Sequence, residues 1–206
     1  MSFPKITITD RATKSLHPNT IFIELSINMT TQHNKKLFIA CHNDDEALFG
    51  AYTLMREKPL VVVVTDGITH KKRFGIDPKT RRAESIKACN IARVSVQFLG
   101  LPDDKLKKSD LKLHFSRLKG FSKIYAPALD GGNPVHDMVS EMAWYVWGDK
   151  VTFYTTYSRV NFHIKGDVVI TPTKRELEKK RKMPVKKRWL LLAHLKLKSI
   201  IKAVSL

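Results

Sequence analysis

Two short and almost wholly apolar runs constrain the fold of this chain more than any other feature. Residues 35–41 read KKLFIAC and residues 59–64 read PLVVVV, and each run ends abruptly in polar residues. Consecutive valines are typical of a strand covered on both faces, and such strands occur almost only in parallel sheets flanked by helices. Helix-like segments follow at 47–58 and 80–92. The sequence therefore predicts repeated strand, turn and helix units in a parallel sheet.

The same alternation continues to about residue 173. Further strands are predicted at 94–100, 122–127, 150–157 and 167–172, with helix-like segments at 103–118 and 136–148. A chain of 206 residues, 43% of them hydrophobic, has room for one sizeable core and a modest appendage. We expect an α/β fold over residues 1–173, with a Rossmann-like, mostly parallel sheet and helices on both faces.

Residues 174–206 differ in composition and are predicted to form a basic, partly helical tail. They hold 12 Lys and Arg against two Glu, or +10 of the formal net charge of +18. Pro184 should end or kink any helix that begins near Arg175. Apolar side chains between 189 and 204 gather imperfectly on one side of a helix, which is typical of an element lying on an anionic membrane. Packing on the sheet, a solvated charged face and nucleic-acid binding are the alternatives, and nucleic acid is the less favoured partner.

Cysteine usage and the absence of a leader favour a cytoplasmic location. The chain has only Cys41 and Cys89, too few for a disulfide framework. Its first residues, MSFPKITITDRATK, lack the apolar segment of a cleaved signal. No run of 18 apolar residues is present, so no bilayer span is predicted. The basic tail leaves open a peripheral position at a membrane surface.

Two polar clusters follow predicted strands, where ligands bind in open α/β sheets. The first is HNDDE at 42–46, in which His42 and Asp45 can supply one nitrogen and one oxygen to a metal ion. Catalytic zinc takes three protein ligands and an open position, and His136 in DGGNPVHD at 130–137 offers the third. Asp44 would then remain available for proton transfer. In the alternative reading, Asp44 and Asp45 only cap a helix and His136 is an ordinary packed or solvated histidine.

The string IACHNDDEALFGA resembles the signature of the LmbE/PIG-L family of zinc-dependent N-deacetylases, in which a strand runs into A-H-P-D-D-E and then a helix. Other segments agree in order. VVVVTDG resembles the second strand and its turn, Arg81-x-x-Glu84 a helix motif, FLGLPDDKL a Leu/Gly-x-x-Asp segment, and GGNPVHD the G-G-H-P-D-H-D loop. The resemblance covers about residues 35–175, and the common order of five motifs is more specific than any one of them.

By position, the resemblance implies that His42, Asp45 and His136 bind Zn²⁺. It further implies that Asp44 is the general base that takes a proton from the attacking water. Arg81 and Asp103 would lie near the sugar, although a solvated helix face and a turn explain them equally well. The activity implied is hydrolysis of the N-acetyl group of an N-acetylglucosamine-type amino-sugar conjugate.

Three positions depart from the family pattern. Asn43 replaces a proline, Asn133 replaces a histidine at a catalytic position, and Val135 replaces an aspartate. Asn133 can donate a hydrogen bond but cannot transfer a proton, and general acid help is worth about 10²–10⁴ in rate. A slow enzyme, an enzyme with another acid and a non-catalytic metal binder are therefore all open. The rival hypothesis is a catalytically weakened scaffold that binds nucleic acid or anionic membrane through its tail.

Overall fold

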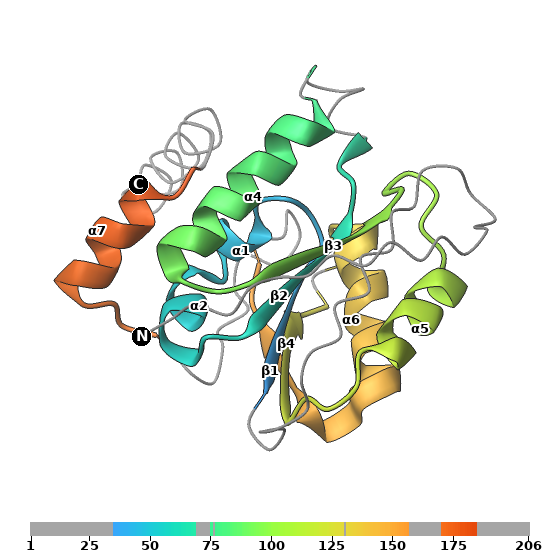
Figure 1. The fold of residues 1–206 in the computed structure, drawn as a ribbon. Helices are drawn as coiled ribbons and strands as arrows, with labels where there is room; N and C mark the ends of the chain where they lie inside the picture. Colours follow the sequence, from blue (N-terminus) through green and yellow to red (C-terminus); the bar gives the residue numbers. More distant parts are fainter. Residues whose placement is uncertain (1–34, 69–74, 76, 130, 157–169, 185–206) are drawn as a thin grey trace, which may run out of the picture.

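The computed structural model describes residues 35–68, 75, 77–129, 131–156 and 170–184. Within these ranges five strands form one sheet in the order β3-β2-β1-β4-β5 (Figure 1). The strands are β1 (Lys36–Ala40), β2 (Leu60–Thr65), β3 (Val96–Leu101), β4 (Lys123–Pro127) and β5 (Val151–Tyr154). Every pairing between them is parallel. The parallel α/β fold predicted from the alternating pattern is confirmed.

Helices cover both faces of this sheet (Figure 1). One face carries α1 (Asp45–Leu48), α2 (Ala51–Glu57) and α4 (Pro78–Ala92), and the other carries α5 (Lys108–Arg117) and α6 (Pro134–Trp147). Side chains alternate along β1, so Phe38 packs toward α2 and α4 whereas Leu37 and Ile39 pack toward α5 and α6. Val61 to Val64 are fully buried for the same reason, because β2 has a helical layer on each side.

The order of the strands creates a switch point between β1 and β4. The chain moves outward from β1 to β2 and β3, and then returns through α5 to place β4 on the other side of β1. Neighbouring crossovers therefore leave β1 and β4 in opposite directions, and ligands of open α/β sheets bind in the crevice that this leaves at the carboxyl ends. Both polar clusters singled out in the sequence follow these two strands.

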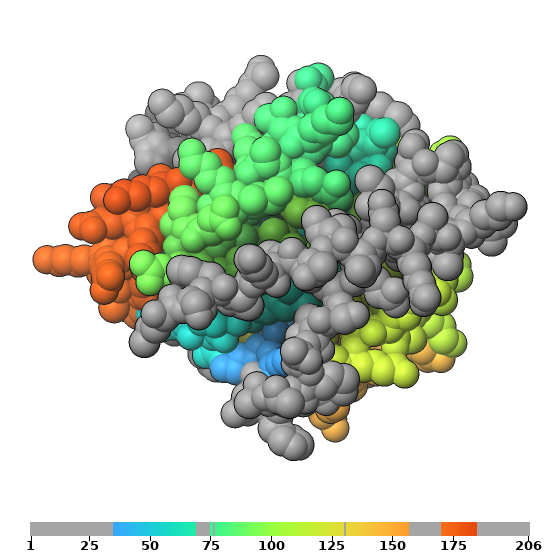
Figure 2. Space-filling model, viewed as in Figure 1, coloured from blue at the N-terminus to red at the C-terminus, as the bar shows by residue number. Residues whose placement is uncertain are grey.

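The helix α7 (Lys174–Lys182) packs against α2 and α4, as the orange and green atoms of Figure 2 show. Thr173 and Glu176 form a capping box at its start, and the helix ends just before Pro184 as expected. Arg56 Nε of α2 lies 2.7 Å from Glu176 Oε1. Met183, 4% exposed, belongs to the apolar cluster beneath α2 and α4. The first part of the basic tail is therefore part of the packed molecule.

Some expectations differ from the structure or lie outside it. The helix expected at 47–58 is divided into α1 and α2 at Phe49 and Gly50. A strand was expected at 167–172. Residues 170–172 form no strand and do not pair with the sheet, and residues 167–169 lie outside the described residues. The amphipathic segment between 189 and 204 also lies outside them. No helix in the described part of the chain is both long and apolar enough to cross a membrane.

Candidate metal centre at the switch point

The backbone at the end of β1 holds the carboxylate of Asp45 in a fixed position. Its Oδ2 accepts hydrogen bonds from the backbone N–H groups of Cys41, at 2.8 Å, and His42, at 3.0 Å. The turn itself is closed by the Asp44 N–H, which donates to the His42 carbonyl at 2.9 Å. Asp45 is 3% exposed. The Asp45 carboxylate is thus held against the backbone at the end of β1.

His136 reaches the same point from the first turn of α6. Its Nε2 lies 3.2 Å from His42 Nδ1 and 3.4 Å from Asp45 Oδ2. His42 Nδ1 lies 3.8 Å from the same carboxylate oxygen. Two imidazole nitrogens and one carboxylate oxygen therefore converge from segments that are 94 positions apart in the chain.

These separations fit a divalent metal ion. Donor atoms arranged tetrahedrally at about 2.0–2.1 Å from an ion lie about 3.3 Å from one another. Cys41 Sγ adds a further donor, since it lies within 4.8 Å of the Asp45 and His136 donor atoms. The set His42, Asp45 and His136 and the set Cys41, Asp45 and His136 share two members, so both describe one place in the fold.

The ionisation of Asp45 agrees with its use as a ligand. Burial by itself raises the pKa of a carboxyl, but the charge and hydrogen bonds of His136, together with those of His42, outweigh burial at Asp45. The pKa of Asp45 is therefore held well below its usual range. Asp45 is a carboxylate at any physiological pH, which is the form that binds metal ions.

His136 is also contacted on its other ring nitrogen. Its Nδ1 lies 3.4 Å from the Thr156 hydroxyl, just beyond β5. A polar contact of this kind on the far nitrogen fixes the orientation of a histidine that binds a metal ion. Thr156 was not identified from the sequence, because nothing in the local pattern links it to a histidine 20 positions away.

Asp44 is buried at 8% exposure and pairs with a buried arginine of α4. Arg81, 1% exposed, forms an ion pair with Asp44 Oδ2 through one amino group. Its other amino group lies 3.0 Å from Glu84 Oε2. The two carboxylates raise the pKa of Arg81 against the opposing effect of its burial. Arg81, expected near the sugar, lies in the protein interior against Asp44.

Asn133 caps the helix that carries His136. Its Oδ1 accepts a hydrogen bond from the Val135 N–H at 3.1 Å, and Pro134 occupies the first helical position. The oxygen of the amide is thus used in the cap, and the NH₂ end is the part that can donate to another group. Asn133 lies three positions before His136, at the same edge of the sheet.

Asp103 lies beyond β3, at the carboxyl edge but beside another acid. Asp103 is 8% exposed. Burial is the main cause that raises the pKa of Asp66, which follows β2, and the charge of Asp103 raises it further. The structure therefore groups Asp103 with Asp66, whereas His42, Asp45 and His136 form the metal-donor group.

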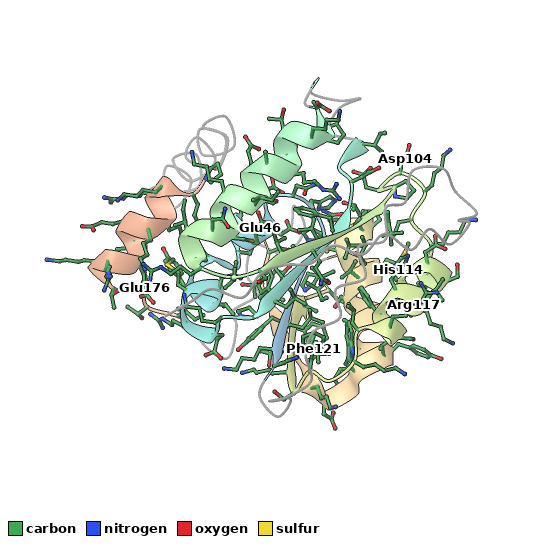
Figure 3. All side chains as sticks on the ribbon, viewed as in Figure 1. Glu46, Asp104, His114, Arg117, Phe121 and Glu176 are labelled. Atoms are coloured by element: carbon green, nitrogen blue, oxygen red, sulfur yellow. The ribbon has the colours of Figure 1, made fainter. Side chains whose placement is uncertain are left out.

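Glu46 is the third acid of the HNDDE segment, and its environment differs from that of Asp44 and Asp45. It is 1% exposed, and Figure 3 shows it in the interior near α4. Burial, followed by the nearby Asp44 and Asp45 carboxylates, raises the pKa of Glu46 to about 8. Glu46 is therefore largely protonated at neutral pH, and it acts as a neutral buried group beneath the site.

Comparison with known sequences identifies the family. The sequence profile of PIG-L, described as GlcNAc-PI de-N-acetylase, matches residues 37–147, which is more than half of the chain. The chain belongs to the PIG-L family. The match begins in β1 and ends in α6, so it includes the elements that carry all the candidate donors of this PIG-L member.

Solved structures share the fold of this PIG-L chain. The N,N′-diacetylchitobiose deacetylase from Pyrococcus horikoshii is similar at a TM-score of 0.60 and 15% identity, over 79% of this chain and 75% of that one. A deacetylase mutant from the teicoplanin biosynthetic pathway is similar at a TM-score of 0.58 and 15% identity, over 73% of this chain and 80% of that one. The deacetylase of an antimicrobial pseudoaglycone is similar at a TM-score of 0.57 and 14% identity, over 73% of this chain and 80% of that one. No protein with a curated function matches the sequence.

Proposed function

We propose that this protein is a zinc-dependent N-deacetylase that removes the acetyl group from an N-acetylated amino-sugar conjugate of the N-acetylglucosamine type. The observation that carries the proposal is the convergence of His42, Asp45 and His136 within 3.2–3.8 Å of one another at the switch point of the sheet. Membership of the PIG-L family supports the reaction, since that family is described by a de-N-acetylase activity. The three similar deacetylase structures support the same reaction class.

Zinc is the ion that this donor set suits best. Imidazole nitrogens with one carboxylate, at tetrahedral spacing, are typical of catalytic zinc sites with three protein ligands. A zinc ion bound there supplies Lewis acidity, which polarises an amide carbonyl and makes water a better nucleophile near neutral pH. His42, Asp45 and His136 are the residues that would hold it.

Asp44 is the residue we assign as the general base. It stands directly between two donors of the metal centre in the sequence, so its carboxylate is at the right edge of the sheet to accept a proton from the attacking water. After the amide bond breaks, the proton held on Asp44 can pass to the departing amine. This return of the proton makes a second acid unnecessary and offsets the inability of Asn133 to transfer one.

Arg81 and Asn133 have supporting roles in this proposal. The buried ion pair of Arg81 with Asp44 orients the base and restrains its rotation, so we assign Arg81 as a positioning residue. Asn133 can donate through its NH₂ group to the oxygen that becomes negative during attack, a contribution of a few kcal/mol for one such donor. Asp103 remains our candidate for a contact to a sugar hydroxyl.

Metal analysis and amide hydrolysis test the proposal together. Purified protein should hold one zinc per chain, and should release acetate and a free amine from N-acetylglucosaminyl conjugates. His136→Ala should lose both properties, whereas Lys112→Ala, on the exposed face of α5, serves as the control. Wild-type protein with one zinc but no acetate release from any such conjugate would leave a metal-binding protein and reject the enzyme. Protein that takes up no zinc would reject the metal site as well.

A further inference from the structure

We propose that the thiol of Cys41 is a fourth donor to the metal ion in this chain. Cys41 Sγ, a carboxylate oxygen of Asp45 and a ring nitrogen of His136 all lie within 4.8 Å of one another. The family signature has alanine at this position, so the donor set His42, Asp45 and His136 alone does not anticipate a sulfur ligand. The inference rests on the metal binding proposed above and extends it to a residue specific to this chain.

The backbone of Cys41 is fixed from both sides. Its N–H donates to Asp45 Oδ2 at 2.8 Å, while its carbonyl accepts from the Thr65 N–H at 3.0 Å and from the Thr65 hydroxyl at 2.7 Å. Rotation about the Cα–Cβ bond is therefore the main freedom left to the sulfur. A zinc–sulfur bond is about 2.3 Å long, so a modest adjustment of this angle would bring Sγ to an ion held by Asp45 and His136.

The direction of the side chain places the sulfur on the side of α6. Residues Leu37, Ile39 and Cys41 alternate with Phe38 and Ala40 along β1 and pack into the cluster that α5 and α6 cover. His136 is in the first turn of α6 and Cys41 is completely buried. The thiol thus faces the donor group from the buried side of the sheet that α5 and α6 cover.

A sulfur donor changes what the centre can do. Thiolates select zinc and cobalt over hard ions such as Mg²⁺ and Mn²⁺, so Cys41 would make the centre more selective. As the metal–sulfur bond forms, the thiol proton leaves to solvent. Four protein donors complete a tetrahedral shell of the kind found in structural sites, whereas three leave a position open for water. Cys41 would therefore strengthen metal binding and compete with the attacking water for the fourth position, which would slow hydrolysis.

Cobalt substitution tests this directly, because a Co²⁺–thiolate bond produces an intense near-ultraviolet charge-transfer absorption that nitrogen and oxygen ligands do not produce. The experiment adds Co²⁺ to metal-free wild type, Cys41→Ala and Cys89→Ala. Cys89 is a matched control, since it is equally buried but belongs to the cluster on the opposite face of the sheet. We expect the band in wild type and Cys89→Ala, and its loss in Cys41→Ala. Zinc affinity of Cys41→Ala, measured by chelator competition, should fall at least about tenfold.

Each other outcome has a separate meaning. Stoichiometric cobalt binding without the band in wild type overturns the role of Cys41 and leaves the three-residue centre intact. A band that persists in Cys41→Ala overturns it too. Absence of cobalt and zinc binding in folded wild type rejects both the inference and the proposed metal centre. A Cys41→Ala variant that fails to fold is replaced by Cys41→Ser, which keeps the volume and should likewise lose the band.

Discussion

The side chains of the HNDDE segment differ in chemistry although they are consecutive. Asp45 is kept ionised by two histidines and two backbone N–H groups, and Asp44 is paired with Arg81. Glu46 is buried beside the Asp44 and Asp45 carboxylates, so its pKa rises to about 8. Differences in environment therefore separate the proposed metal ligand Asp45 and the proposed base Asp44 from Glu46, a neutral buried acid.

Replacement of the base separates metal binding from turnover. We expect Asp44→Asn to retain one zinc per chain, because Asp44 is not among the converging donors, and to lose about 10²–10⁴ in kcat as expected for loss of a general base. Acetate-release kinetics and metal analysis on the same sample measure the two properties. A variant with full activity would show that another group accepts the proton.

A substitution of Arg81 provides a further check on the proposed role of Asp44. If Arg81 orients Asp44, Arg81→Lys should lower kcat more than it changes KM, as steady-state kinetics of acetate release measure. A change confined to KM would instead indicate that Arg81 contacts the sugar.

Glu46 gives a pH dependence of stability whose sign follows from its raised pKa. In metal-free protein the unfolded chain loses the Glu46 proton near pH 4.5, whereas the folded chain keeps it until about pH 8. The contribution of Glu46 to stability is therefore greatest below pH 4.5 and is lost as the pH rises to about 8, at roughly 1.4 kcal/mol per pKa unit. Glu46→Gln should remove this decline, as measured by urea unfolding in chelator between pH 5 and pH 8. Equal slopes in both proteins would contradict a raised pKa.

The elements of this fold follow from the sequence where burial is uniform, and less well where one residue ends a helix. Strands β1 and β2 were predictable because each is a short apolar run between polar residues, whereas residues 170–172 of the strand expected at 167–172 do not join the sheet. The division between α1 and α2 was not predictable, because Gly50 lies in an otherwise helical pattern. A Cβ at Gly50 would lie 2.8 Å from Phe38 Cε2, so close packing against the sheet requires glycine there.

This close approach gives a stability prediction at the level of the α1–α2 junction. Gly50→Ala should destabilise the protein by about 1–3 kcal/mol, because the new methyl group overlaps the buried Phe38 ring. The ring also stacks on Tyr154 at a centroid distance of 4.8 Å, which restricts its movement. Chemical denaturation measures the loss. In a Phe38→Leu background the same substitution should cost less, and an equal cost in both backgrounds would exclude the ring as the obstacle.

At the scale of the molecule, the alternation of strands and helices predicted the layers and placed both polar clusters at the carboxyl edge of the sheet. The pairing of β1 with β4, which the structure shows, brings the residues after these two strands together. The contacts of Arg81, Thr156 and Cys41 were not predictable in this way. These contacts join side chains from different strands and helices, and neither periodicity nor motif spacing indicates which side chains meet.

The place of α7 gives a prediction about the whole chain. Removal of residues 174–206 should lower stability, because it takes away the buried Met183, whose side chain alone contributes about 1.5–3 kcal/mol, and the Arg56–Glu176 pair. Removal of residues 185–206 alone keeps every contact described for α7 and should therefore cost less stability than removal of residues 174–206. Thermal unfolding of the two truncations compares them. Equal stability of both would show that α7 is dispensable to the fold.

The 94-residue separation between His42 and His136 bears on how the chain matures during synthesis. At about 5–20 residues per second, the ribosome makes the second histidine roughly 5–20 s after the first. Until β4 and the start of α6 have emerged and docked, the nascent chain has only part of the proposed donor set. Capture of an ion at the proposed centre would thus be a late event in folding.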